Sequence, residues 1–202
     1  MLFEIICDEF KEKRVEFHNG LNTVLGTSSG DNSIGKSSFL MIVDFVFGGS
    51  TYTKSADIIR NVGHHDIKFS FVFGKKQHWF IRNTLESSDV WDCDNSYKKL
   101  KSISLDQYCE WLNQEYGLSL PFLSFRDAVG RYIRVYGKEN LNEKFPLHVV
   151  KDEKAKKASY ALLKLFDLYT PVHELTGIYE RSKDELSIYK KAQKYKFISK
   201  IT

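Results

Sequence analysis

The sequence has few cysteines, no long apolar run and no low-complexity tract. There are three cysteines, an odd number, and they lack metal-type spacing: Cys7, Cys93 and Cys109. We therefore expect them to be small core residues of a protein in a reducing, cytoplasmic setting. No stretch of about 18 apolar residues is present that could cross a membrane. Acidic residues interrupt the apolar N-terminus at Glu4 and Asp8, so we expect no signal peptide and no membrane partner.

Charge is close to balanced overall but unevenly distributed. The chain of 202 residues is 42% hydrophobic and 28% charged, which is typical of a globular domain with a real core. Residues 151–202 hold 12 lysines and arginines against 7 aspartates and glutamates, whereas residues 1–150 carry a net charge of −1. The basic segment could attract DNA, and a solvated helix face is an equally good interpretation.

Alternation of apolar and polar residues predicts a strand-rich first half with one early helix. We expect short strands within residues 1–8, 14–17 and 21–25, with a His18-Asn19-Gly20 turn before the last. Residues 36–47 have the apolar spacing of a largely buried helix that ends at Gly48-Gly49. Residues 50–66 look polar and looped, and strands at 67–73, 77–85 and 89–93 predict an antiparallel meander.

The second half changes to helical spacing. We expect helices at 105–116 and 155–169, with a mixed, unassigned segment at 121–150. Pro171 should start another helix. Beyond it, apolar and then polar residues recur at steps of three and four, the spacing of a short heptad seam: Val172, Leu175, Tyr179, Ser182, Leu186, Tyr189, Gln193 and Lys196.

One motif points to specific chemistry. Eight consecutive residues match the phosphate-binding pattern G-x-x-x-x-G-K-[ST]. They are Gly30, Asp31, Asn32, Ser33, Ile34, Gly35, Lys36 and Ser37, and Ser38 follows directly. Glycines let the backbone curl so that N–H groups converge on phosphate oxygens. The helix that starts after Gly35 adds partial positive charge. We expect Lys36 to reach the β- and γ-phosphates of ATP and the Ser37 hydroxyl to coordinate Mg²⁺.

Other parts of a nucleotide-hydrolysing site are harder to find. Leu162–Asp167 ends in an acid, but Lys164 interrupts the run and its spacing is helical, so we reject it as the Mg²⁺-binding strand. Lys13 and Arg14 could flank an adenine, or could be surface charges. Arg60 could contact a nucleotide or nucleic acid, or lie on the surface.

The order of these features resembles the N-terminal half of an SMC-like, ABC-type ATPase head, as in uncharacterised prokaryotic SMC-like ATPases. The resemblance rests on the strands before the motif, on Gly30–Ser38 with Asn32 inside it, on Ile58–Gly63, and on the heptad helix after Tyr169. It implies an α/β P-loop head with an antiparallel β lobe (residues 1–150) and a helical segment that starts a coiled-coil arm (residues 151–202).

The same resemblance implies partners and a function. ATP and Mg²⁺ would be bound with a C-terminal half of the head, or a second copy, that supplies the signature, the Mg²⁺ acid and the catalytic glutamate. Ile133–Gly137, at the family's glutamine-loop position, has no glutamine. The expected role is DNA repair, chromosome maintenance or antiviral defence. A small P-loop kinase or GTPase, and a non-catalytic scaffold with a vestigial P-loop, stay open as alternatives.

Overall fold

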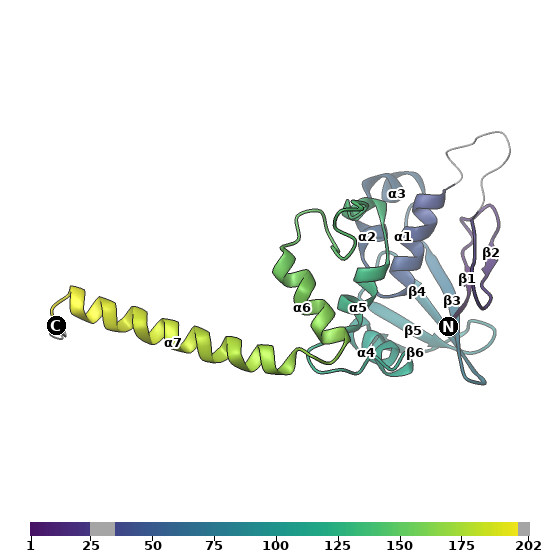
Figure 1. The fold of residues 1–202 in the computed structure, drawn as a ribbon. Helices are drawn as coiled ribbons and strands as arrows, with labels where there is room; N and C mark the ends of the chain where they lie inside the picture. Colours follow the sequence, from purple (N-terminus) through teal and green to yellow (C-terminus); the bar gives the residue numbers. More distant parts are fainter. Residues whose placement is uncertain (25–34, 198–202) are drawn as a thin grey trace.

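An antiparallel sheet of six strands organises the described part of the chain (Figure 1). The structure, a computed structural model, describes residues 1–24 and 35–197. The strand order is β2-β1-β3-β4-β5-β6. The strands are β1 (Leu2–Ile6), β2 (Arg14–Glu16), β3 (Asp66–Phe73), β4 (Lys76–Asn83), β5 (Asp89–Cys93) and β6 (Lys99–Ser104). The expected strand pair before the motif and the β3–β5 meander are therefore confirmed.

Helices make up the remaining regular structure of the described residues. They are α1 (Lys36–Val46), α2 (Thr51–Lys54), α3 (Ala56–Asn61), α4 (Leu105–Glu115), α5 (Phe125–Tyr132), α6 (Ala155–Leu165) and α7 (Thr170–Lys194), with a 3₁₀ turn at Tyr136–Lys138. A mixed α/β chain is thus confirmed, and the finer expectation of a P-loop ATPase head stays a prediction.

The hydrophobic core forms where α1 and α4 cover one face of the sheet. Ile67, Phe69 and Phe71 alternate along β3 and are fully buried, as the period of two requires. Tyr108 of α4 packs against Phe69 and Phe80 at ring-centroid distances of 6.1 and 5.2 Å. Burial of each such side chain stabilises the fold by about 1.5–3 kcal/mol, so this face fixes the position of α1.

The C-terminal end of α1 is held by buried polar groups. Arg82 of β4, 1% exposed, donates hydrogen bonds to the carbonyls of Phe45 (2.6 Å) and Gly49 (2.9 Å). The hydroxyl of Tyr108 donates to the carbonyl of Val46 at 2.9 Å. At Phe45 and Val46, these donors satisfy carbonyls that a helix end leaves without an intrahelical partner. Gly48 follows at φ 85°, so the predicted glycine stop is confirmed.

The prediction of a strand at residues 21–25 is wrong for residues 21–24, the part that the structure describes. Residues 21–24 have no regular structure, and Leu25 lies outside the described residues. The Asn22 side chain accepts a hydrogen bond from the N–H of His18 and donates to its carbonyl, at 3.0 and 2.8 Å. These bonds tie the Asn22 side chain to the backbone of His18 and favour a local turn.

Two other segments differ from expectation. Residues 50–66, expected as a loop, hold α2 and α3, and buried Tyr52 (3% exposed) anchors α2 to the core. The helix expected to reach residue 169 ends at Leu165. There Asp167 adopts φ 56°, and the N–H of Leu168 donates to the carbonyl of Leu163 at 2.7 Å. This is the hydrogen bonding of a Schellman stop, so Asp167 ends a helix and no strand.

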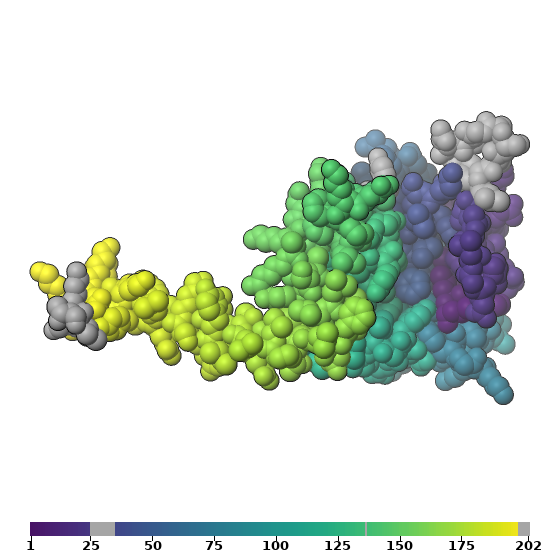
Figure 2. All heavy atoms as spheres, viewed as in Figure 1, coloured from purple at the N-terminus to yellow at the C-terminus, as the bar shows by residue number. Residues whose placement is uncertain are grey.

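α7 projects away from the body (Figures 1 and 2). Its start at Thr170 with Pro171 in the first turn confirms the predicted helix. None of its residues is buried, and its first turn contacts the body where His173 lies 4.4 Å from Phe122 between ring centroids. The helix ends at Lys194, so Lys196 of the predicted heptad seam lies beyond it.

Candidate functional site

At the N-terminal end of α1, the structure describes the last residues of the motif. Gly35 takes the left-handed conformation with φ 75° and ψ 13°, and Lys36 is the first helical residue. The first N–H groups of a helix have no acceptor within it, and the helix dipole adds partial positive charge there. The first turn of α1 contains no acidic residue. This helix end is therefore suited to an anion.

The structure describes only part of the predicted loop. Gly30, Asp31, Asn32, Ser33 and Ile34 lie outside the described residues, so their role stays a prediction. Lys36 and Ser37 are exposed and Ser38 is half-buried. Gly35, Lys36 and Ser38 line one pocket. Ser37, the predicted Mg²⁺ ligand, lies in the same helical turn but does not line it.

The pocket beside Lys36 has a volume of about 550 Å³. That lies within the range of about 300–1,000 Å³ that is usual for small-molecule sites. Its walls come from the β1–β2 turn, from residues 23 and 24, from α1 and from the α2–α3 region. The lining residues are Glu9, Phe10, Lys11, Glu12, Val15, Thr23, Val24, Gly35, Lys36, Ser38, Phe39, Ile42, Tyr52 and Val62.

One side of this pocket is apolar and aromatic. Phe10 approaches Phe39 of α1 edge-on at 6.4 Å between ring centroids, and Phe17 stacks on Phe39 at 6.2 Å. Phe10 and Phe39 both line the pocket. Such a surface suits the face of a flat heterocycle. Sequence reasoning did not find Phe10, because only the tertiary fold brings the β1–β2 turn next to α1.

Two part-buried hydrogen bonds fix another part of the wall. The Nδ1 of His65 lies 3.0 Å from the carbonyl of Gly63, which can only accept, so Nδ1 carries the proton. Nε2 then accepts from the Tyr52 hydroxyl at 3.0 Å. Burial raises the pKa of Tyr52 to about 12, so this hydroxyl stays protonated at neutral pH. Tyr52 therefore lines the pocket as a neutral group.

The other cations considered from the sequence lie elsewhere. Arg14 makes ion pairs with Glu4 (2.9 Å) and Glu16 (2.8 Å) on the strand pair. Lys13 is exposed, and Arg60 is exposed at the end of α3. None of these three side chains lines the pocket. Of the predicted cations in the described residues, Lys36 is thus the one at this site.

The residue predicted to coordinate Mg²⁺ at this helix end is Ser37. Across residues 1–24 and 35–197, no group of three or more His, Cys, Asp and Glu side chains is placed to hold a metal ion. A serine hydroxyl in the first turn after the loop fits a Mg²⁺ ion that takes its other ligands from phosphate and water. The described residues at this helix end therefore offer main-chain N–H groups, the Lys36 ammonium and the Ser37 hydroxyl.

Comparison with protein-family models finds no match, and comparison with curated proteins finds no significant similarity. Within the described part of the chain, no helix has the length and apolar character needed to cross a membrane.

Proposed function

We propose that the chain binds ATP with Mg²⁺ through Gly30–Ser38, as the N-terminal part of an SMC-like ATPase that acts on DNA. One observation carries the proposal. The motif runs directly into α1, with Gly35 left-handed and Lys36 first in the helix, and both residues line a pocket of ligand size. Main-chain donors, the ammonium groups of Lys11 and Lys36 and an apolar wall on one pocket match a nucleotide's phosphates and base.

Each residue has a distinct role in this proposal. The Lys36 ammonium neutralises charge on the terminal phosphates, and the N–H groups at the start of α1 donate to phosphate oxygens. Ser37 holds Mg²⁺, which when bound offsets phosphate charge. Phe10 and Phe39 exclude water from one face of the base. Residues 151–202, with their excess of lysine, are the part proposed to approach DNA.

The exposed seam of the projecting helix α7 supports a role for a partner helix. Leu175, Tyr179 and Leu186 of the heptad seam are exposed by 67, 63 and 51%. Apolar residues in a seam of this spacing are typically covered by another helix. We propose that α7 begins a coiled-coil arm, and that a C-terminal half of the head or a second copy completes the nucleotide site.

The first test is nucleotide binding by the purified chain and by Lys36→Ala. Loss of one charge-assisted contact is worth about 1.5–3 kcal/mol, so the affinity for a fluorescent ATP analogue with Mg²⁺ should fall about 10–150-fold. Lys75→Ala is the matched control, because Lys75 is exposed in the β3–β4 turn and does not line the pocket. Equal affinity of the Lys36→Ala variant and the unaltered chain contradicts the proposal. Competition by ATP against GTP separates it from a GTPase.

The second test is hydrolysis. The chain has no ABC-type signature after the motif, and Asp167 ends α6 rather than a strand. Without an acid for the metal and a base for water, catalysis beyond binding is not expected. Phosphate release measured by malachite green should stay at background. Turnover that Lys36→Ala abolishes would show that this chain contains a complete site.

A further inference from the structure

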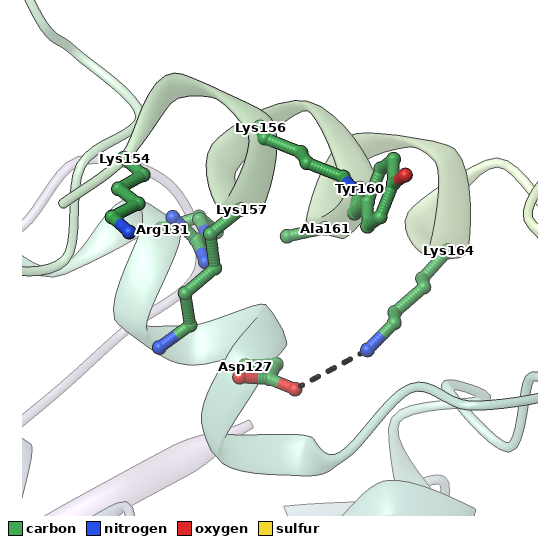
Figure 3. Close-up of a pocket in the computed structure, with 8 residues that line it drawn as sticks. All are labelled: Asp127, Arg131, Lys154, Lys156, Lys157, Tyr160, Ala161 and Lys164. Carbon is green, nitrogen blue, oxygen red and sulfur yellow. Dashed lines mark ion pairs between the residues drawn. The ribbon is translucent and has the colours of Figure 1, made fainter. Parts of the chain in front are cut away.

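A second pocket lies between α5 and α6 and is dominated by cations (Figure 3). Its volume is about 240 Å³, below the range of about 300–1,000 Å³ for drug-sized ligands. It has room for a small anion or for one group of a larger polyanion. The lining residues are Asp127, Arg131, Lys154, Lys156, Lys157, Tyr160, Ala161 and Lys164. No residue of the nucleotide motif takes part, so this site is separate from the proposed ATP site.

Internal ion pairs neutralise only part of this charge. Lys164 lies 3.9 Å from Asp127, as the dashed line in Figure 3 marks, and Lys157 lies 3.8 Å from Glu153. Lys154 and Lys156 make no ion pair with any residue that the structure describes. A positive charge therefore remains around the pocket after its own acids are counted.

The lysines are placed where an isolated helix disfavours them. Lys154 is the N-cap of α6 and offers no side-chain cap, and the first turn contains Lys156 and Lys157 but no acid. The start of a helix carries partial positive charge, which favours anions and opposes cations. A bound anion would remove this repulsion and accept hydrogen bonds from the first N–H groups of α6.

A buried donor without an acceptor lines the same pocket. Arg131 of α5 is 2% exposed. Its Nη atoms donate to Glu153 and to the carbonyl of Leu147. Its Nε is buried and has no hydrogen-bond partner among the described residues. A buried unsatisfied donor is costly, so this N–H identifies a place where an acceptor is missing.

We propose that this pocket binds a phosphoryl group, held by Lys154, Lys157 and the start of α6, with Arg131 behind it. A doubly charged oxyanion matches several cations and several N–H donors at once. The ligand is either a free phosphate compound or a backbone phosphate of nucleic acid. The proposal goes beyond the ATP site and stands whether or not the P-loop binds nucleotide.

The test uses the full chain with Lys36→Ala, so that the P-loop does not compete for phosphate. Inorganic phosphate is titrated at constant ionic strength, because salt screens exposed charges. The Nε–Hε signal of Arg131 in ¹⁵N–¹H spectra should shift and saturate. Lys154→Gln with Lys157→Gln should weaken binding about tenfold or more. Lys75→Gln with Lys76→Gln, which removes the same charge from exposed residues in the β3–β4 turn and at the start of β4, should leave the binding unchanged.

A second arm distinguishes the source of the phosphate. Labelled single-stranded DNA is titrated by anisotropy against the same variants. If inorganic phosphate saturates the Arg131 signal, and only Lys154→Gln with Lys157→Gln weakens phosphate binding, a free phosphate compound is supported. If only DNA binds, and only Lys154→Gln with Lys157→Gln weakens DNA binding, a backbone phosphate is supported. The proposal is overturned if neither ligand shifts Arg131, or if both double variants weaken binding equally, as non-specific charge attraction would. Melting curves confirm that every variant is folded.

Discussion

Replacement of Glu153 by alanine is expected to lower the free energy of unfolding by about 3–5 kcal/mol at neutral pH. The Arg131 and Glu153 side chains are 1% and 2% exposed. Both Nη atoms of Arg131 donate to the carboxylate, and the N–H of Val149 donates to it at 3.1 Å. Alanine would leave the guanidinium buried with no counter-charge, and desolvation of an unpaired cation is the source of the cost.

Urea unfolding followed by circular dichroism measures this loss. Glu180→Ala is the matched control, because Glu180 pairs with Lys183 at 3.5 Å on the surface, with both side chains more than half exposed. An exposed pair is worth about 0–1 kcal/mol. The double variant Arg131→Met with Glu153→Leu should recover most of the stability, since an apolar pair has no unpaired charge. A loss below about 1 kcal/mol in Glu153→Ala contradicts the burial of the pair.

The same pair should make stability depend on pH in a defined direction. Burial by itself would raise the pKa of Glu153, but hydrogen bonds from Arg131 and from the N–H of Val149 outweigh it, and the pKa lies below its usual value. The folded state therefore binds this proton more weakly than the unfolded state. The stabilisation is complete above the unfolded pKa of about 4.3 and is lost as the pH falls through the folded pKa. The difference in free energy of unfolding between the unaltered chain and Glu153→Gln should therefore shrink as the pH falls through this range.

Sequence periodicity predicts the elements whose two faces differ in environment. β3 alternates because one face meets α4 and the core, and the spacing within α1 reflects its buried side. β6 was missed for the opposite reason. It is the edge strand, and Lys99, Leu100 and Lys101 are exposed, so no apolar alternation marks it.

Short elements depend on contacts that the local sequence does not contain. α2 has four residues, fewer than an isolated helix needs, and it is held by Tyr52, which bonds to His65. α5 contains Gly130, a weak helix former. A Cβ at this position would approach the Val149 side chain to 3.2 Å, so the glycine permits close packing that local propensity does not indicate.

The candidate sites divide in the same way. The phosphate motif is contiguous, so Gly35–Ser38 could be identified from spacing alone. The opposite wall combines Phe10 with Tyr52, which only the fold brings together. The basic excess of residues 151–202 was visible in the composition. The concentration of that charge around Arg131 of α5 was not, because Arg131 belongs to a segment that showed no clear period.

Asp44→Asn is expected to destabilise the protein by about 3–5 kcal/mol, the usual effect of removing one partner from a buried ion pair. Asp44 is fully buried within α1. Its carboxylate accepts from Arg126 of α5 at 2.6 Å and from Lys138 at 3.0 and 3.1 Å. Asparagine keeps the shape but removes the charge that two partly buried cations share. Thermal or urea unfolding measures the loss, with exposed Asp184→Asn on α7 as the control.

This variant also separates stability from nucleotide binding. Asp44 lies eight residues after Lys36 in the same helix, which is about 12 Å along the axis at 1.5 Å per residue. It anchors the far end of α1 to α5 and makes no contribution to the pocket beside Lys36. Well below its melting temperature, Asp44→Asn should therefore bind the ATP analogue as tightly as the unaltered chain. Affinity that falls in parallel with stability would mean that the geometry of the phosphate loop depends on the buried ion pairs of α1, and that the two ends of this helix are energetically coupled.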